Sequence, residues 1–303
     1  MKKQDLAKQL TSPSKNSRLE KFGKTITFLC LILIVFIVAM ILLFVAQKGL
    51  STFFVNGVNI FDFLFGKNWQ PTVKDAHGNY IMGALPMITG SFIVTILSAL
   101  IATPFAIGAA IFMTEISPKR GAKLLQPAIE LLTGIPSVVY GFIGLQVIVP
   151  FVRALFGGTG FGILSGVFVL FVMILPTVTF MTTDSLRSVP RHYREASLAM
   201  GATRWQTIWR VILRAAKPGI FTAVVFGMAR AFGEALAIQM VVGNSAVMPT
   251  SLITPASTLT SVLTMGIGNN VLWSLALVLL IMSLAFNMLM KFITREKKVN
   301  YER

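Results

Sequence analysis

Residues 25–46 read TITFLCLILIVFIVAMILLFVA, an unbroken stretch without a charged side chain. As an α-helix this stretch extends about 33 Å, enough to cross a hydrocarbon core of about 30 Å. The apolar run is too long for a cleaved secretory signal, and the FVAQKGL that closes it lacks a small-x-small cleavage pattern. The stretch therefore predicts an uncleaved transmembrane helix in an integral membrane protein.

Further apolar stretches follow along the chain of 303 residues, which is 55% hydrophobic and only 13% charged. Charges, or clusters of Gly, Pro and Asn, bound each stretch. The predicted spans are 85–114, 128–152, 161–183, 218–242 and 271–291. We therefore expect an all-α membrane protein with six transmembrane helices. Its membrane domain covers 25–293, between cytoplasmic tails at 1–24 and 294–303.

The net charge of +16 is distributed unevenly along the chain. Twenty-two Lys and Arg residues lie in 1–24, 115–126, 184–217 and 291–303, whereas the opposite loops hold four. The positive-inside rule then places both termini and the 184–217 loop in the cytoplasm, as in a multi-pass plasma-membrane protein. Topology accounts for the basic charge, so we expect membrane lipid and no nucleic acid as a partner.

The residues that usually build catalytic or metal sites are scarce. Cys30 is the single cysteine, and His77 and His192 are predicted on opposite sides of the membrane. Gly23-Lys24-Thr25 resembles the end of a phosphate-binding loop, but Arg18 stands where that loop needs glycine. We expect no catalytic residue, no metal and no cofactor on this chain, and any ATP to be bound by another subunit.

The predicted cytoplasmic loop contains REASLAMGATRWQTIWRVILRAAKPGI at 194–220. A short apolar turn precedes Gly201, and after it Trp205, Ile208 and Trp209 recur at helical spacing. This pattern predicts two short helices that meet at Gly201, where glycine permits a turn that a side chain would hinder. A surface-lying amphipathic helix is the alternative interpretation.

The loop also resembles the EAA loop of ABC importer permeases. Glu195, Ala196 and Ser197 are followed by three residues, Gly201, nine residues and Val211-Ile212-Leu213. The resemblance implies a coupling helix that docks into a cytoplasmic ATPase through Glu195, Ala196, Ser197 and Gly201. Ser197 replaces the second alanine of the motif. Arg214 replaces its proline, which leaves open the angle at which the next helix leaves the loop.

Three further stretches resemble the PstC-type branch of that family: FLFGKNWQP (63–71), IELLTGIPSVVYGFIGL (129–145) and ARAFGEALAIQMVVGN (229–244). The resemblance implies the type I permease fold and a non-enzymatic subunit that imports inorganic phosphate. It also implies a PstA-like second permease, PstB-like ATPase subunits and an external PstS-like phosphate-binding protein. The alternatives are an importer of molybdate, sulfate or phosphonate, and a channel or carrier that needs no ATPase.

Arg230 and Glu234 lie four residues apart in an apolar stretch, where each charge costs about 2.5–3.5 kcal/mol at mid-membrane. One interpretation is an ion pair on a shared helix face, which serves only to hold helices together. The functional interpretation places both residues on the substrate path. Arg230 then presents its donors to a passing oxyanion, while Glu234 holds the guanidinium and moderates its attraction.

Overall fold

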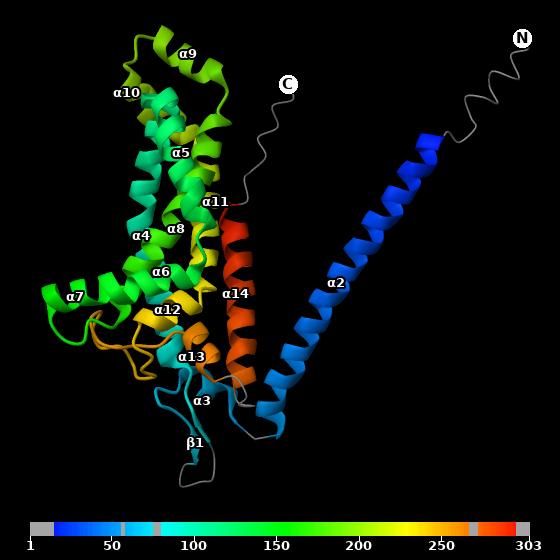
Figure 1. The fold of residues 1–303 in the computed structure, drawn as a ribbon, viewed down its shortest axis with the longest axis vertical. Helices are drawn as coiled ribbons and strands as arrows, with labels where there is room; N and C mark the ends of the chain where they lie inside the picture. Colours follow the sequence, from blue (N-terminus) through cyan, green and yellow to red (C-terminus); the bar gives the residue numbers. More distant parts are fainter. Residues whose placement is uncertain (1–14, 56–57, 75–79, 267–271, 295–303) are drawn as a thin grey trace, which may run out of the picture.

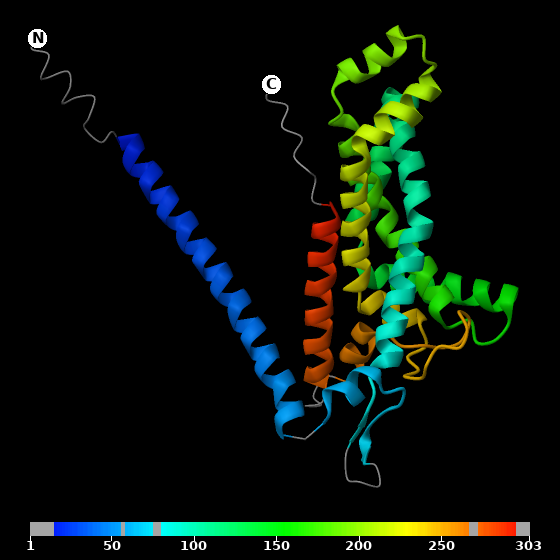
Figure 2. The same ribbon diagram turned by 180° about the vertical axis from the view of Figure 1, so that it is seen from behind.

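The computed structural model describes residues 15–55, 58–74, 80–266 and 272–294, and these are mostly helical (Figures 1 and 2). Within these ranges, five helical segments are long and apolar enough to cross a membrane, and a shorter apolar helix, Leu272–Met288, lies within α14 (Leu272–Thr294). The five are Leu19–Phe54, Leu85–Ile116, Ser137–Phe156, Ile163–Arg187 and Arg204–Phe232. The all-α membrane architecture is confirmed, and α14 brings the number of apolar helices to six.

Helices α4 (Leu85–Ile111) and α8 (Ile163–Arg187) form the centre of the bundle. The buried face of α4 consists largely of small residues: Gly90, Ser91, Ser98, Ala99, Ala102, Ala106 and Ala110. Small side chains let helix backbones approach closely in a membrane, where burial from water gives no drive to association. Helix α11 (Leu213–Phe232) packs against α8 in the same way, since a Cβ on Gly227 would lie 2.5 Å from Val178.

Helix α2 (Lys15–Val55) leaves the bundle at an angle and contacts it mainly through α14, near its own C-terminal end (Figures 1 and 2). There the rings of Phe44 and Trp273 pack edge to face, with centroids 5.1 Å apart. The apolar side chains of α2 between Phe28 and Phe44 are exposed. Lipid or another subunit has to cover a surface of this size.

The predicted helix at 128–152 is not continuous in the structure. Helix α5 (Pro118–Gly134) is followed by Ile135, whose backbone is extended, and α6 (Ser137–Ile143) begins after Pro136. Proline lacks an N–H group and disfavours helical geometry in the preceding residue, so the chain turns there. A π-helical turn, η2 (Gly144–Ile148), joins α6 to α7 (Val149–Phe156), and these helices lie across the bundle axis (Figure 1).

The predicted span at 218–242 is also interrupted. Helix α11 ends at Phe232, and α12 (Leu236–Val241) begins only after Gly233, Glu234 and Ala235. The prediction of one continuous helix is therefore wrong. This correction matters for the site, because it places Arg230 and Glu234 in different segments.

The two ends of the bundle differ in their elements (Figure 1). One end carries α9 (Arg191–Ala199) and α10 (Arg204–Thr207), and the start of α2 and the end of α14 point toward it. The other end carries α3 (Ile60–Phe65), α13 (Leu259–Met265) and an antiparallel hairpin that the sequence analysis did not anticipate, β1 (Trp69–Lys74) with β2 (Tyr80–Met82). This grouping matches the charge distribution, which predicts that the α9–α10 end is cytoplasmic.

Cysteine labelling tests this orientation. In a Cys30→Ser background, we expect a cysteine at Thr250 to react with a membrane-impermeant maleimide in intact cells. A cysteine at Met200 should react only after permeabilisation. Both positions are exposed, so access to the reagent depends on the side of the membrane. The opposite pattern would overturn the topology.

Candidate functional site

The predicted pair of short helices at Gly201 is confirmed. Helix α9 ends at Ala199, and α10 begins at Arg204. Gly201 has φ = +81°, in the left-handed region that favours glycine, and a Cβ added there would meet no atom within 4 Å. Backbone conformation, rather than lack of space, is therefore the reason for a glycine at this turn.

Side-chain hydrogen bonds hold the second short helix in place. Thr203 and Gln206 form a capping box: the Gln206 N–H donates to Thr203 Oγ1 (3.2 Å), and the Thr203 N–H donates to Gln206 Oε1 (2.9 Å). Ser197 Oγ lies 2.9 Å from Thr207 Oγ1 and so joins α9 to α10. Serine in place of the motif's second alanine thus adds a hydrogen bond that alanine cannot make.

The tip formed by α9 and α10 presents an exposed surface of mixed character. The Glu195 and Ala196 side chains are exposed, and Met200 is 88% exposed. Trp205 is also exposed, and its ring stacks on that of Trp209, an exposed residue two positions beyond α10, with centroids 5.9 Å apart. Apolar side chains around a carboxylate suit docking to another protein, but the coupling roles of Glu195, Ala196, Ser197 and Gly201 stay predictions.

Arg194 anchors α9 to the bundle, and the sequence analysis missed this contact. Its Nη2 lies 2.6 Å from Oε1 of Glu115, and its Nε donates to the same carboxylate at 3.1 Å. Nη1 and Nη2 also donate to the carbonyls of Val189 (2.7 Å) and Leu186 (3.1 Å). Glu115 lies in η1 (Phe112–Ile116), the π-helical turn that continues α4. One guanidinium therefore connects the loop to both central helices.

Arg230 lies in the last turn of α11, half-buried, and its Nη1 donates to Thr177 Oγ1 on α8 at 2.7 Å. Among the described residues, Arg194 and Glu115 form an ion pair, and none joins Arg230 to Glu234. The predicted pair of Arg230 with Glu234 is therefore not formed. Because α11 ends at Phe232, the four-residue spacing no longer places the two side chains on one helix face.

Glu234 instead satisfies backbone and hydroxyl groups around the helix break. Its Oε1 accepts a hydrogen bond from the Ala237 N–H at the start of α12 (3.1 Å), and its carbonyl accepts one from Thr260 Oγ1 (2.7 Å). It borders a cavity of about 10 Å³, close to the size that one water needs. The other polar residues that line this cavity are Ser91, Thr95, Thr258 and Thr260.

Residues 102–299 match the family described as binding-protein-dependent transport system inner membrane component. A probable ABC transporter permease protein of Bacillus subtilis, YqgH, is 50% identical over 304 residues, which cover 97% of each chain. The phosphate transport system permease protein PstC of Mesorhizobium japonicum is 35% identical over 205 residues, 61% of each chain.

Solved ABC importers share the fold. An inward-facing structure of the methionine transporter MetNI matches with a TM-score of 0.56 at 20% identity, over 68% of this chain and 92% of that chain. A bacterial alginate transporter matches with a TM-score of 0.59 at 16% identity, over 91% of this chain and 98% of that chain. At these identities the likeness concerns the fold alone.

The Glu115–Arg194 contact predicts how firmly the α9–α10 tip is held. We expect Glu115→Gln to speed tryptic cleavage at Arg204 several-fold in the purified protein, because it removes the charge that holds Arg194. Glu130→Gln is the matched control, since Glu130 is exposed on α5 and accepts a hydrogen bond from Gln126. Equal cleavage rates in both variants would show that the contact does not hold the tip.

Proposed function

Because this chain belongs to the binding-protein-dependent transport system inner membrane component family, and so is the permease subunit of an ABC transporter, we propose that it imports inorganic phosphate. The support is its similarity to permeases named PstC, from Mesorhizobium japonicum and Pasteurella multocida among others. ATP is hydrolysed on separate PstB-like subunits. A PstA-like permease completes the path, and a PstS-like protein delivers the anion.

Arg230 is the group on this chain best suited to contact the anion. A guanidinium has five N–H donors, and the hydrogen bond to Thr177 uses one of them. No other hydrogen bond of Arg230 is seen among the described residues, so several donors remain for an oxyanion. Its planar fork matches two phosphate oxygens. The cost of an arginine in a membrane-spanning helix is a further reason to assign it a function.

The proposed role of Glu234 changes with the structure. It does not hold the Arg230 guanidinium, because its carboxylate is directed to the Ala237 N–H across the helix break. It still places a negative charge four residues from Arg230, so it limits how strongly an anion is held there. A carboxylate can also accept the proton of hydrogen phosphate, which sulfate lacks.

The α9–α10 tip is the proposed contact with the ATPase. Its exposed side chains surround a turn that Gly201 fixes, and the helices on either side of it carry the Thr177–Arg230 hydrogen bond. Helix α8 leads into α9, and α10 leads through η3 (Ile208–Ile212) into α11. A displacement of the tip therefore reaches both partners of that bond.

Two other functions compete with phosphate import. The fold does not select the anion, so a molybdate, sulfate or phosphonate importer is the first competitor. A channel or carrier without an ATPase is the second, and membership of the ABC permease family argues against it.

Uptake of radiolabelled phosphate by the reconstituted complex tests the proposal at Arg230. Wild type should take up phosphate only with ATP, and Arg230→Gln should lose most uptake while the complex still assembles. Arg230→Lys should restore little, because it lacks the planar fork. Thr177→Val keeps the guanidinium and should retain most uptake.

Exchanging the two charges separates this role from scaffolding. Since the structure has no Arg230–Glu234 ion pair, Arg230→Glu with Glu234→Arg should not restore transport. Normal uptake by the exchanged protein would show that the two residues act only as a structural pair.

The turn at Gly201 gives a prediction for coupling. Gly201→Val should abolish uptake and substrate-stimulated ATP hydrolysis, because a β-branched residue is strained by about 1–3 kcal/mol at positive φ. Gly201→Asn is the matched control, since asparagine tolerates this conformation and the surrounding space is open. Glu195→Lys should also lose uptake and substrate-stimulated ATP hydrolysis, because it reverses the charge at this surface. Normal stimulation in Gly201→Val would exclude the tip as the coupling element.

A further inference from the structure

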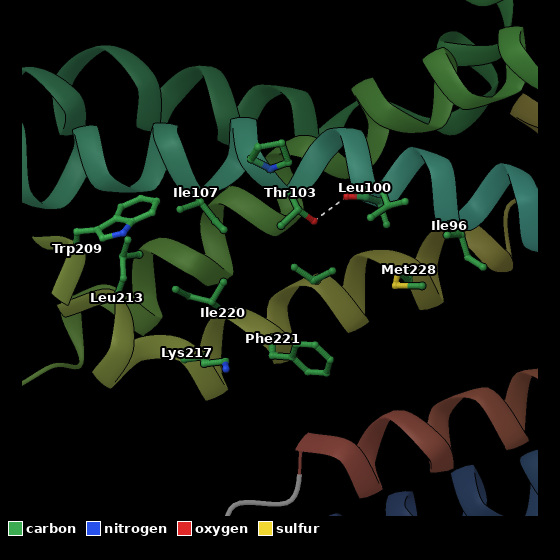
Figure 3. A pocket seen from close by; sticks show the side chains of 13 residues that line it. Ile96, Leu100, Thr103, Ile107, Trp209, Leu213, Lys217, Ile220, Phe221 and Met228 are labelled. Atoms are coloured by element: carbon green, nitrogen blue, oxygen red, sulfur yellow. Dashed lines mark hydrogen bonds between the residues drawn. The ribbon is translucent and has the colours of Figure 1, made fainter. Parts of the chain in front are cut away.

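An apolar groove of about 550 Å³ runs between α4 and α11 (Figure 3). Its α4 wall extends from Ile96 to Ile107, and its α11 wall from Leu213 to Met228. The residues proposed for the phosphate path, Arg230 and Glu234, do not line this groove.

The lining is suited to a hydrocarbon chain. Its side chains are aliphatic or aromatic apart from Thr103 and Lys217, with Trp209 at one end. The Thr103 hydroxyl donates to the carbonyl of Ala99 at 2.6 Å, so its one donor is already used (Figure 3). A volume of this size falls in the range typical of small-molecule sites.

The length and position of the groove fit one leaflet of a bilayer. Eleven helical steps separate Ile96 from Ile107, which corresponds to about 16 Å. Half of a hydrocarbon core of about 30 Å is close to this length. Both walls belong to segments that are long and apolar enough to span the membrane. An acyl chain can therefore lie along the groove without leaving its leaflet.

One end of the groove is polar and basic. Figure 3 shows Trp209 and Leu213 at this end and Ile96 and Met228 at the other, with Lys217 on the side of Trp209. No hydrogen bond or ion pair of Lys217 is seen among the residues that the structure describes. Tryptophan and lysine are the residues that lie at lipid headgroup level. Arg214, three residues before Lys217 on the same helix, is also exposed.

We propose that this groove binds a phospholipid with an anionic headgroup, with one acyl chain between α4 and α11 and the headgroup phosphate at Lys217. The ligand comes from the leaflet on the α9–α10 side. The groove lies between α4, a central helix of the bundle, and α11, which carries Arg230. The bound lipid therefore fills a gap between these two helices.

Photo-crosslinking identifies the occupant. The complex purified through a tag on this chain would carry p-benzoylphenylalanine in place of Phe221 on the groove wall, or of Phe36 on the exposed face of α2 as a control. Vesicles of equal parts phosphatidylglycerol and phosphatidylcholine supply the probe lipids. Mass spectrometry then measures the lipid adducts at each position.

At Phe221 we expect phosphatidylglycerol adducts to exceed phosphatidylcholine adducts about fivefold, the effect of one basic side chain at the membrane surface. At Phe36 the ratio should be near parity. Lys217→Gln should bring the Phe221 ratio close to parity, whereas Lys119→Gln, an exposed lysine outside the groove, should leave it unchanged. Thr103→Phe should reduce all lipid adducts at Phe221, because it fills the groove.

Two results would overturn the proposal. A crosslink from Phe221 to the second permease subunit would show that protein occupies the groove. Equal headgroup ratios at Phe221 and Phe36 would show bulk lipid without a specific site.

Discussion

Backbone polar groups inside a bilayer must find partners within the protein, because the hydrocarbon core offers none. This constraint explains why the chain is helical and how it tolerates two helix breaks. At the end of α5, the Tyr140 hydroxyl donates to the carbonyl of Leu132 at 2.7 Å. At the start of α12, the Glu234 carboxylate accepts from the Ala237 N–H. Two polar side chains, Tyr140 and Glu234, thus lie where the chain interrupts its own hydrogen bonding, and Glu234 stabilises the fold in addition to any role toward an anion.

The same packing connects the exposed tip to the charged interior. Helix α11 is about 30 Å long; it begins beside the tip and carries Arg230 in its last turn. Thr177, the hydrogen-bond partner of Arg230, lies on α8, which leads into the tip from the other side. Arg194 adds a third connection, from α9 to the π-helical end of α4 through Glu115. A partner that moves the tip would act on three central helices at once. With the tip as the proposed ATPase contact and Arg230 on the proposed anion path, this arrangement gives a physical basis for coupling ATP hydrolysis at one end to anion passage in the middle.

Most of the helices could be predicted from the sequence, because the length of an apolar run, the asymmetry of basic residues between loops and the glycine at the 201 turn can each be read from the chain alone. The spans near α2, α4, α8 and α14, and the two short helices at Gly201, are confirmed. Pro136 indicates an interruption of its span in the sequence, whereas the break at Gly233 was not predicted, because the apolar pattern continues through it. The predicted ion pair of Arg230 and Glu234 was wrong for that reason, because the four-residue spacing rule assumes an unbroken helix. The contacts of Arg230 with Thr177 and of Arg194 with Glu115 join residues 53 and 79 positions apart, and no periodicity signals them.

Import of inorganic phosphate rather than another tetrahedral oxyanion is the proposed function of this permease. The most direct measurement is ATP-driven uptake of radiolabelled phosphate into proteoliposomes that contain the complete complex and its external binding protein, with sulfate, molybdate or a phosphonate added in hundredfold excess. Uptake should persist in each case and be abolished only by excess unlabelled phosphate. Uptake of labelled sulfate or molybdate in place of phosphate would contradict the proposed function.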